Sequence, residues 1–245
     1  MFSSNEMHWD FALILLFLGV VVPVLGRRRI RQLLNSPETS QMDRLSIYAS
    51  TIAFQWLTTA IILWRTRVHG ISVPHLGVAI PKPALAITIA IVLAALISVN
   101  QIFSLRRLVA NPSEIRGVLP QLALKLFPQD GVERLVFFAL VLTVAICEEF
   151  IYRGFVQRVF QDWFGHVVAG IAGSAIFFSL AHLYQGRKGL YTTTIVGALF
   201  SIVRAWTGSL FPTFIAHFVA DFSVGMSAPA KLRAAGIHAG ESDSN

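Results

Sequence analysis

The stretch that decides the fold is RLVFFALVLTVAICEEFIYRGF, residues 134–155, in which an apolar run leads directly into two glutamates and an arginine. The apolar part is typical of the first half of a membrane-spanning helix. Glu148, Glu149 and Arg153 would then lie within the bilayer, where an ionisable side chain is costly and needs a partner or a function. The stretch therefore predicts a membrane helix that carries a functional polar site.

The composition of the whole chain supports a membrane protein. Of its 245 residues, 55% are hydrophobic and only 13% are charged, and the mean hydropathy is +0.64. A soluble domain carries about 25% charged residues. We expect an all-α, polytopic transmembrane bundle of about seven spans, in which the last four enclose a polar cavity. The expected spans are residues 11–26, 45–64, 84–103, 135–160, 166–184, 190–206 and 210–226.

Three regions are expected along the chain. Residues 1–134 hold the N-terminal transmembrane helices, followed by a basic, apolar and proline-containing segment that suits an amphipathic helix at the membrane interface. Residues 135–226 form the candidate catalytic core, and the small polar residues of 227–245 predict a disordered tail. No internal repeat is visible.

The net charge of +7 comes mostly from short basic runs between apolar segments, such as GRRRIR at residues 26–31. This pattern indicates membrane topology and not nucleic-acid binding, and it favours an N-terminus outside and a C-terminus inside. The single cysteine, Cys147, excludes an internal disulfide and a cysteine-rich metal site. We expect it to pack in the core and not to react.

Helical spacing separates the two adjacent glutamates. Glu149 and Arg153 are four residues apart, so they share a helix face and can form a salt bridge. Glu148 lies on a face rotated by about 100° and has only the phenol of Tyr152 one turn away, so it must find a partner on another helix. The Glu149–Arg153 pair could be purely structural or could serve the site, and both interpretations remain open.

Two later expected spans add histidines and one more carboxylate. Phe178 and His182 are one turn apart near the end of the fifth span, and His217 and Asp221 are one turn apart in the seventh. Each histidine alone could be an interhelical hydrogen-bond donor. Together with Glu148 they would be expensive to keep in a membrane without a purpose, so we expect them to converge on one buried site.

The three motifs resemble those of a known family. EEFIYR (148–153) fits an EExxxR pattern, FSLAH (178–182) fits FxxxH, and HFVAD (217–221) fits HxxxN/D. Their order and spacing resemble the CPBP family of intramembrane metalloproteases, which includes type II CAAX prenyl proteases and Abi, or bacteriocin-immunity-like, proteins. The similarity covers residues 135–226, which is under half of the chain.

The resemblance implies an intramembrane peptidase in which Glu148 and His182 position and activate a water. It implies that His217 and Asp221 stabilise the oxyanion or help to hold a metal. These four residues could form a set for zinc or another divalent metal, because they supply nitrogen and oxygen ligands. The third motif often ends in Asn in the family, and an ionised Asp221 cannot donate a hydrogen bond to an oxyanion. No cofactor is required by the sequence, and metal use is left open.

The remaining motif residues are expected to support the site. The resemblance implies that Glu149 and Arg153 stabilise it and that Tyr152 and Phe178 line its pocket. The implied substrate is a membrane-embedded or lipid-anchored protein or peptide, reached from within the lipid bilayer, with no nucleic acid involved. The resemblance places the site of prenyl-protease members on the cytosolic side, whereas the charge pattern here starts the fourth span inside, so the side on which the site opens is left open.

Two other classes of function compete with the peptidase. A transporter or proton relay also uses Glu, His and Asp in membrane helices, although the paired repeats typical of transporters are not visible here. A non-catalytic immunity or scaffold protein could keep the same fold. Loss of peptide cleavage in variants of Glu148 and His182 would favour the peptidase.

Overall fold

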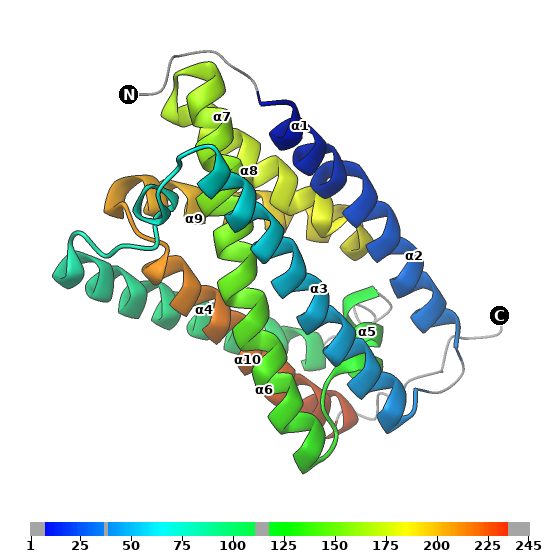
Figure 1. Ribbon diagram of the computed structural model, residues 1–245. Helices are drawn as coiled ribbons and strands as arrows, with labels where there is room; N and C mark the ends of the chain where they lie inside the picture. Colours follow the sequence, from blue (N-terminus) through cyan, green and yellow to red (C-terminus); the bar gives the residue numbers. More distant parts are fainter. Residues whose placement is uncertain (1–7, 37–38, 111–117, 235–245) are drawn as a thin grey trace.

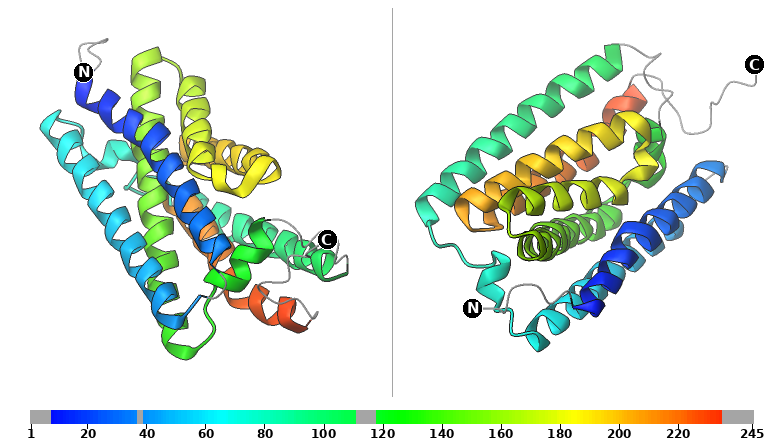
Figure 2. Two further views of the ribbon diagram at one scale, coloured as in Figure 1. Left: turned by 90° about the vertical axis from the view of Figure 1, so that its right-hand side faces the viewer. Right: turned by 90° about the horizontal axis from the view of Figure 1, so that it is seen from above.

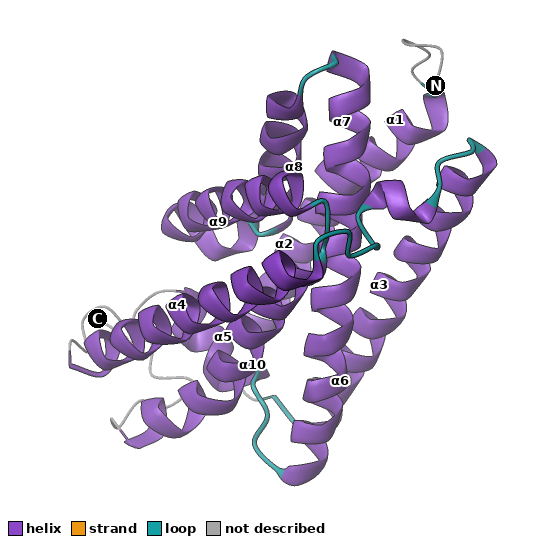
Figure 3. Ribbon diagram, turned by 90° about the vertical axis from the view of Figure 1, so that its left-hand side faces the viewer, coloured by secondary structure: helices purple, strands orange, loops and turns teal. Residues whose placement is uncertain are grey.

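The computed structural model describes residues 8–36, 39–110 and 118–234, and within these ranges its regular elements are all helices (Figure 1, Figure 3). This confirms the predicted all-α class. Two elements, η1 and η4, are π-helical, and η2 and η5 are short 3₁₀ helices. The elements in chain order are α1 (Trp9–Leu16), η1 (Phe17–Val21), α2 (Val22–Asn35), α3 (Gln41–Val68), η2 (Val73–Leu76), α4 (Pro83–Ala110), α5 (Val118–Leu126), α6 (Gly131–Glu148), η4 (Glu149–Val156), α7 (Gln157–Phe164), α8 (Val167–Ala181), η5 (Leu183–Gln185), α9 (Gly186–Thr207) and α10 (Phe211–Ala234).

The candidate membrane spans are fewer than the seven expected. Among the described residues, four helices are long and apolar enough to cross a membrane, and a bent pair could add a fifth. The bent pair joins Val167–Ala181 to Leu183–Thr207 at 58°, so the fifth and sixth expected spans form one broken unit. The seventh, α10, is a continuous helix whose polar residues keep it outside this set. The four spans are Trp9–Asn35, Gln41–Val68, Pro83–Arg107 and Gly131–Phe164.

The continuous helix α6–η4–α7 lies at the centre of the bundle, and the other long helices pack around it (Figure 1, Figure 2). Helix α3 packs along α6, α8 folds back against α7 and pairs with α9, and α4 pairs with α10. Helix α10 also contacts α6. Because residues 148–153 lie in the central helix, both halves of the chain surround the first motif.

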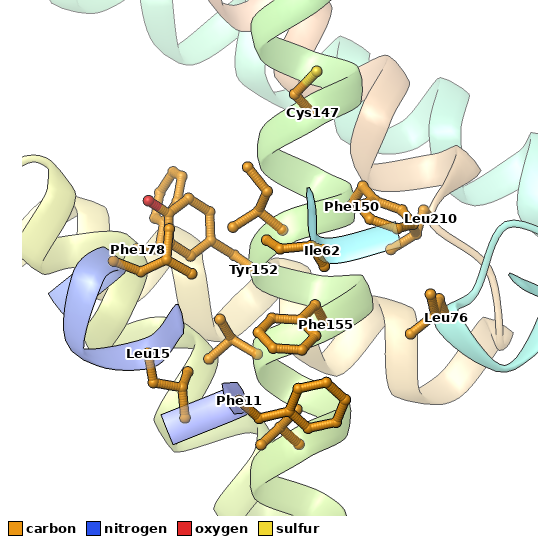
Figure 4. Packing of buried hydrophobic residues seen from close by; sticks show 14 of the residues in the cluster. Phe11, Leu15, Ile62, Leu76, Cys147, Phe150, Tyr152, Phe155, Phe178 and Leu210 are labelled. Atoms are coloured by element: carbon orange, nitrogen blue, oxygen red, sulfur yellow. The ribbon is translucent and has the colours of Figure 1, made fainter. Parts of the chain in front are cut away.

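The largest apolar cluster surrounds the π-helix η4 (Figure 4). Phe155 on η4 is fully buried and meets the ring of Phe11 from α1 edge to face, with centroids 5.2 Å apart. Ile62 from α3 and Leu76 from η2 are also fully buried in this cluster. Full burial of such a side chain contributes about 1.5–3 kcal/mol. The N-terminal helices therefore hold the first motif in place, a role that their sequence alone did not reveal.

A buried ion pair joins α3 to the start of α6. The guanidinium of Arg44 donates two hydrogen bonds to one carboxylate oxygen of Glu133, at 2.7 and 2.9 Å. Asp130 caps α6 by accepting a hydrogen bond from the backbone N–H of Glu133, which lowers the pKa of the Asp130 carboxyl. Arg44 thus fixes the pairing of α3 with α6.

The structure bears on two expectations about the less regular segments, and it corrects the second. The predicted interfacial segment contains α5, whose Leu122, Ala123 and Leu124 are buried against neighbouring helices; its place relative to the membrane stays a prediction. Lys125 is buried as well and donates to the carbonyl oxygens of Leu33 and Leu34, at 3.2 and 2.9 Å, at the end of α2. The predicted disordered tail begins too early, because α10 continues to Ala234. Residues 235–245 lie outside the described part of the chain.

Small residues let α8 approach its neighbours closely. A Cβ added to Gly170 would lie 2.6 Å from the backbone oxygen of Gln157, and one added to Gly173 would lie 2.5 Å from the ring of Phe160. Helix α9 contacts α8 as well, because Ser201 of α9 donates a hydrogen bond to Ser174 of α8 at 3.0 Å. Helix α8, which ends at the second motif, is thereby fixed between α7 and α9.

Replacing Gly170 with alanine is expected to lower the free energy of unfolding by about 1–3 kcal/mol, because the new methyl group meets rigid backbone and forces the two helices apart. Chemical unfolding in detergent micelles, followed by circular dichroism, measures the change. The matched control is Gly131→Ala, where a Cβ meets nothing within 4 Å. Equal stability of the Gly170→Ala variant and the wild type would contradict this close contact between α7 and α8.

Candidate active site

The first motif forms the π-helix η4, in which all eight residues are buried. A π-helical turn is wider than an α-helical turn and is found mostly as a short insertion at functional sites. Glu148 is the last α-helical residue before it, and Glu149 is its first residue. The two adjacent carboxylates therefore leave the central helix where its geometry changes, a feature that α-helical spacing could not predict.

Glu149 and Arg153 form the predicted salt bridge, at 2.9 Å, with both side chains essentially inaccessible to solvent. The same Glu149 oxygen also accepts a hydrogen bond from Nδ1 of His217, at 2.9 Å. The guanidinium carbon of Arg153 lies 4.1 Å from the ring centroid of Phe178 and 5.3 Å from that of Phe200, which adds cation–π attraction. Glu149 thus connects the first motif to the third through His217, and Arg153 contacts the second motif through the ring of Phe178.

Glu148 finds its partner on another helix, as predicted, but that helix is α3. Nε2 of Gln55 donates to one carboxylate oxygen of Glu148 at 2.9 Å. The other oxygen, Oε2, is buried and has no hydrogen-bond partner within the described ranges, and it lies 3.9 Å from Nε2 of His217. Sequence reasoning missed Gln55, whose only signal is an amide within the apolar run TIAFQWL, residues 51–57.

His182 lies directly after α8, at the bend of the broken helix pair. Its Nδ1 is 2.8 Å from the backbone oxygen of Phe178. Since a carbonyl can only accept, Nδ1 must carry the proton, and a neutral ring then presents Nε2 as an acceptor. The rings of Phe178 and Tyr184 lie on the imidazole at centroid distances of 4.5 and 5.9 Å and hold its orientation.

The third motif lies on α10, where different carboxylates approach the two ring nitrogens of His217. Nδ1 of His217 is held by Glu149, whereas Asp221 lies 3.5 Å from Nε2 with a side chain that is 44% exposed. The three carboxylates of Glu148, Glu149 and Asp221 therefore surround one imidazole. A positive charge on His217 would be stabilised from several directions.

The four predicted catalytic residues line one cavity of about 560 Å³: Glu148, His182, His217 and Asp221. Phe178 also lines it, as predicted, together with Gln55 and Tyr184. Tyr152 does not. The Tyr152 ring packs edge to face on Phe178 with centroids 5.4 Å apart, so Tyr152 supports the Phe178 ring without lining the cavity itself (Figure 4). The volume suits a small-molecule or short-peptide site, which typically measures about 300–1,000 Å³.

The predicted metal set does not take the form of a closed ligand cluster. Within the residues that the structure describes, no group of three or more His, Cys, Asp or Glu side chains is placed so that it could hold a metal ion. His217 binds Glu149 through Nδ1, and Nδ1 of His182 faces a backbone carbonyl, so each ring keeps its Nε2 available. The zinc set stays a prediction that the metal content of the purified protein would decide.

These observations define a multi-pass helical membrane protein with a polar cavity inside its bundle. Residues 131–223 match the family described as type II CAAX prenyl endopeptidase, Rce1-like. The match includes all three motifs and confirms the resemblance predicted from them.

A second similarity is to the uncharacterized protein YpbD of Bacillus subtilis strain 168, with 30% identity over 98 residues. The aligned segment covers 40% of this chain and 47% of YpbD, so the chain spans about half the length of this relative. No solved structure matches the chain.

Proposed function

We propose that the protein is an intramembrane endopeptidase that hydrolyses a peptide bond of a membrane-embedded or lipid-anchored protein or peptide. The observation that carries the proposal is the free carboxylate oxygen of Glu148, which is buried without a partner in the described part of the chain and borders a cavity shared with His182 and His217. The family match of residues 131–223 supports the same class of reaction.

The proposed reaction begins with a water between Glu148 and His182. Oε2 of Glu148 takes a proton from the water, whose oxygen attacks the carbonyl carbon, and Nε2 of His182 positions that water by accepting its second hydrogen bond. Gln55 occupies the other oxygen of Glu148 and thereby directs the free one toward the cavity. When the tetrahedral intermediate collapses, the C–N bond breaks and Glu148 returns its proton to the leaving amine.

His217 is the proposed oxyanion donor. Its Nδ1 is engaged by Glu149, so Nε2–H is the group that can point at a developing negative charge. Asp221 lies beside this nitrogen and stabilises the charged ring. An ionised carboxylate cannot donate a hydrogen bond to an oxyanion, so the role proposed for Asp221 is to stabilise the charge on His217. On this proposal Arg153 and Phe178 are positioning residues. Arg153 acts by holding Glu149, and Phe178 acts by holding the ring of His182.

A proton relay is the second candidate function, because Nε2 of His217 lies 3.9 Å from Glu148 and 3.5 Å from Asp221. Two assays on the same purified protein distinguish the peptidase from the proton relay. The purified protein is offered a library of quenched fluorescent apolar peptides in detergent, and the same protein in liposomes with an internal pH dye is tested for proton flux. Cleavage that disappears in both Glu148→Ala and His182→Ala supports the peptidase. Proton flux that depends on Glu148, without cleavage, would replace it with the relay, and neither activity would favour a scaffold.

A further inference from the structure

A second, larger cavity lies beside the candidate active site. It measures about 1080 Å³ and is bordered by α4, α5, α10 and the start of α9. Its walls are mainly apolar, and Figure 2 shows the paired helices α4 and α10 that form one side. The apolar wall residues are Ile102, Leu105, Val118, Leu119, Phe127 and Leu232. A cavity of this size, at the upper end of ordinary ligand sites, is large enough for a long apolar chain.

Three cations stand at this cavity. Arg187 and Lys188 come from the first turn of α9, and Lys231 comes from the last part of α10; all three are exposed. None of them forms a salt bridge within the described residues, and no residue known to line the cavity is acidic. The cavity thus combines an apolar interior with a positively charged border.

The position of two of these cations is unfavourable for the helix that carries them. The first turn of a helix bears the positive end of its dipole, where acidic side chains stabilise and basic ones do not. Helix α9 has no acidic residue in its first turn, and Gln185 at its N-cap makes no capping hydrogen bond with its side chain. Arg187 and Lys188 therefore do not stabilise the start of α9, and an anion bound there would compensate both the cations and the dipole.

We propose that this cavity binds an anionic phospholipid, with an acyl chain between α4, α5 and α10 and the phosphate at Arg187, Lys188 and Lys231. A phospholipid unites the two required chemistries, a long apolar chain and a negative head, and the bilayer supplies it at high concentration. Basic pockets between membrane helices are a recurrent mode of anionic headgroup recognition. The site shares Gln101, Leu119, Phe127, Gln185 and Val224 with the candidate active-site cavity, so a bound lipid would border the path of a substrate.

Native mass spectrometry of the full-length protein in detergent tests the proposal independently of any peptidase activity. The probes are phosphatidylglycerol, phosphatidylcholine with the same acyl chains, and inorganic phosphate. We expect one retained phosphatidylglycerol per chain and little retention of the other two. The triple variant Arg187→Gln, Lys188→Gln, Lys231→Gln should bind phosphatidylglycerol about a hundredfold more weakly, because each cation contributes about fivefold.

Two further variants separate the headgroup from the chain. Arg27→Gln, Arg28→Gln, Arg31→Gln removes three exposed cations of α2 that do not line the cavity, and it should bind the lipid as the wild type does. Ser104→Trp, at an exposed position lining the cavity, should weaken lipid binding at unchanged charge. Equal retention of both phospholipids, equal loss in the two triple variants, or binding of inorganic phosphate as tight as that of the lipid would overturn the proposal.

Discussion

Glu148→Gln is expected to lower kcat for peptide hydrolysis by about 10³-fold, within the range of about 10² to 10⁴ for the loss of a general base. The amide has the shape of the carboxylate, and its oxygen can still accept the hydrogen bond from Gln55. What it loses is the ability to take a proton from water. The measurement is kcat on the best peptide from the library, with the melting temperature of the variant in detergent as a check that the fold is kept.

Thr193→Val is the matched control for this substitution. Thr193 lines the same cavity, and its hydroxyl donates to backbone oxygens of its own helix, α9, so the change removes a polar atom without removing a base. We expect its kcat to stay within about threefold of the wild type, because the proposed proton transfer does not involve it. If Glu148→Gln kept more than a tenth of the wild-type kcat, Glu148 would not be the base.

The spacing of the motif residues predicted much of the site, because helical geometry fixes which side chains of one helix share a face. The Glu149–Arg153 salt bridge follows from a separation of four residues and persists although η4 is π-helical. The gathering of Glu148, His182, His217 and Asp221 at one cavity follows from the cost of leaving such groups alone in a membrane.

Contacts between distant helices could not be predicted in this way. Gln55 is 93 residues from Glu148, and no pattern in one sequence states which face of α3 packs on α6. The same reason hid the contact of Glu149 with His217, 68 residues away. Hydropathy also could not predict that residues 166–206 form a bent helix pair, because it measures apolar length and does not detect the 58° bend after α8.

Glu149→Gln is expected to lower the free energy of unfolding by about 3–5 kcal/mol, because it leaves the buried guanidinium of Arg153 without its counter-charge. Arg153 is completely buried, and its Nε and Nη2 already have no hydrogen-bond partner in the described part of the chain. The rings of Phe178 and Phe200 stabilise the cation only partly. Guanidinium-induced unfolding in micelles, followed by circular dichroism, measures the difference.

The central helix also carries an exposed pair with the same spacing, Arg158 and Asp162, at 2.7 Å on α7. Asp162→Asn should cost only about 0.3–0.5 kcal/mol, because water screens this pair and takes over its hydrogen bonds. The double variant Glu149→Leu, Arg153→Met should be more stable than Glu149→Gln, since removing both charges leaves no buried ion unpaired. Equal losses for Glu149→Gln and Asp162→Asn would show that the Arg153 charge is reached by water. Because the Arg153 charge is buried, the stability of this helix depends on Glu149, the carboxylate that also binds His217.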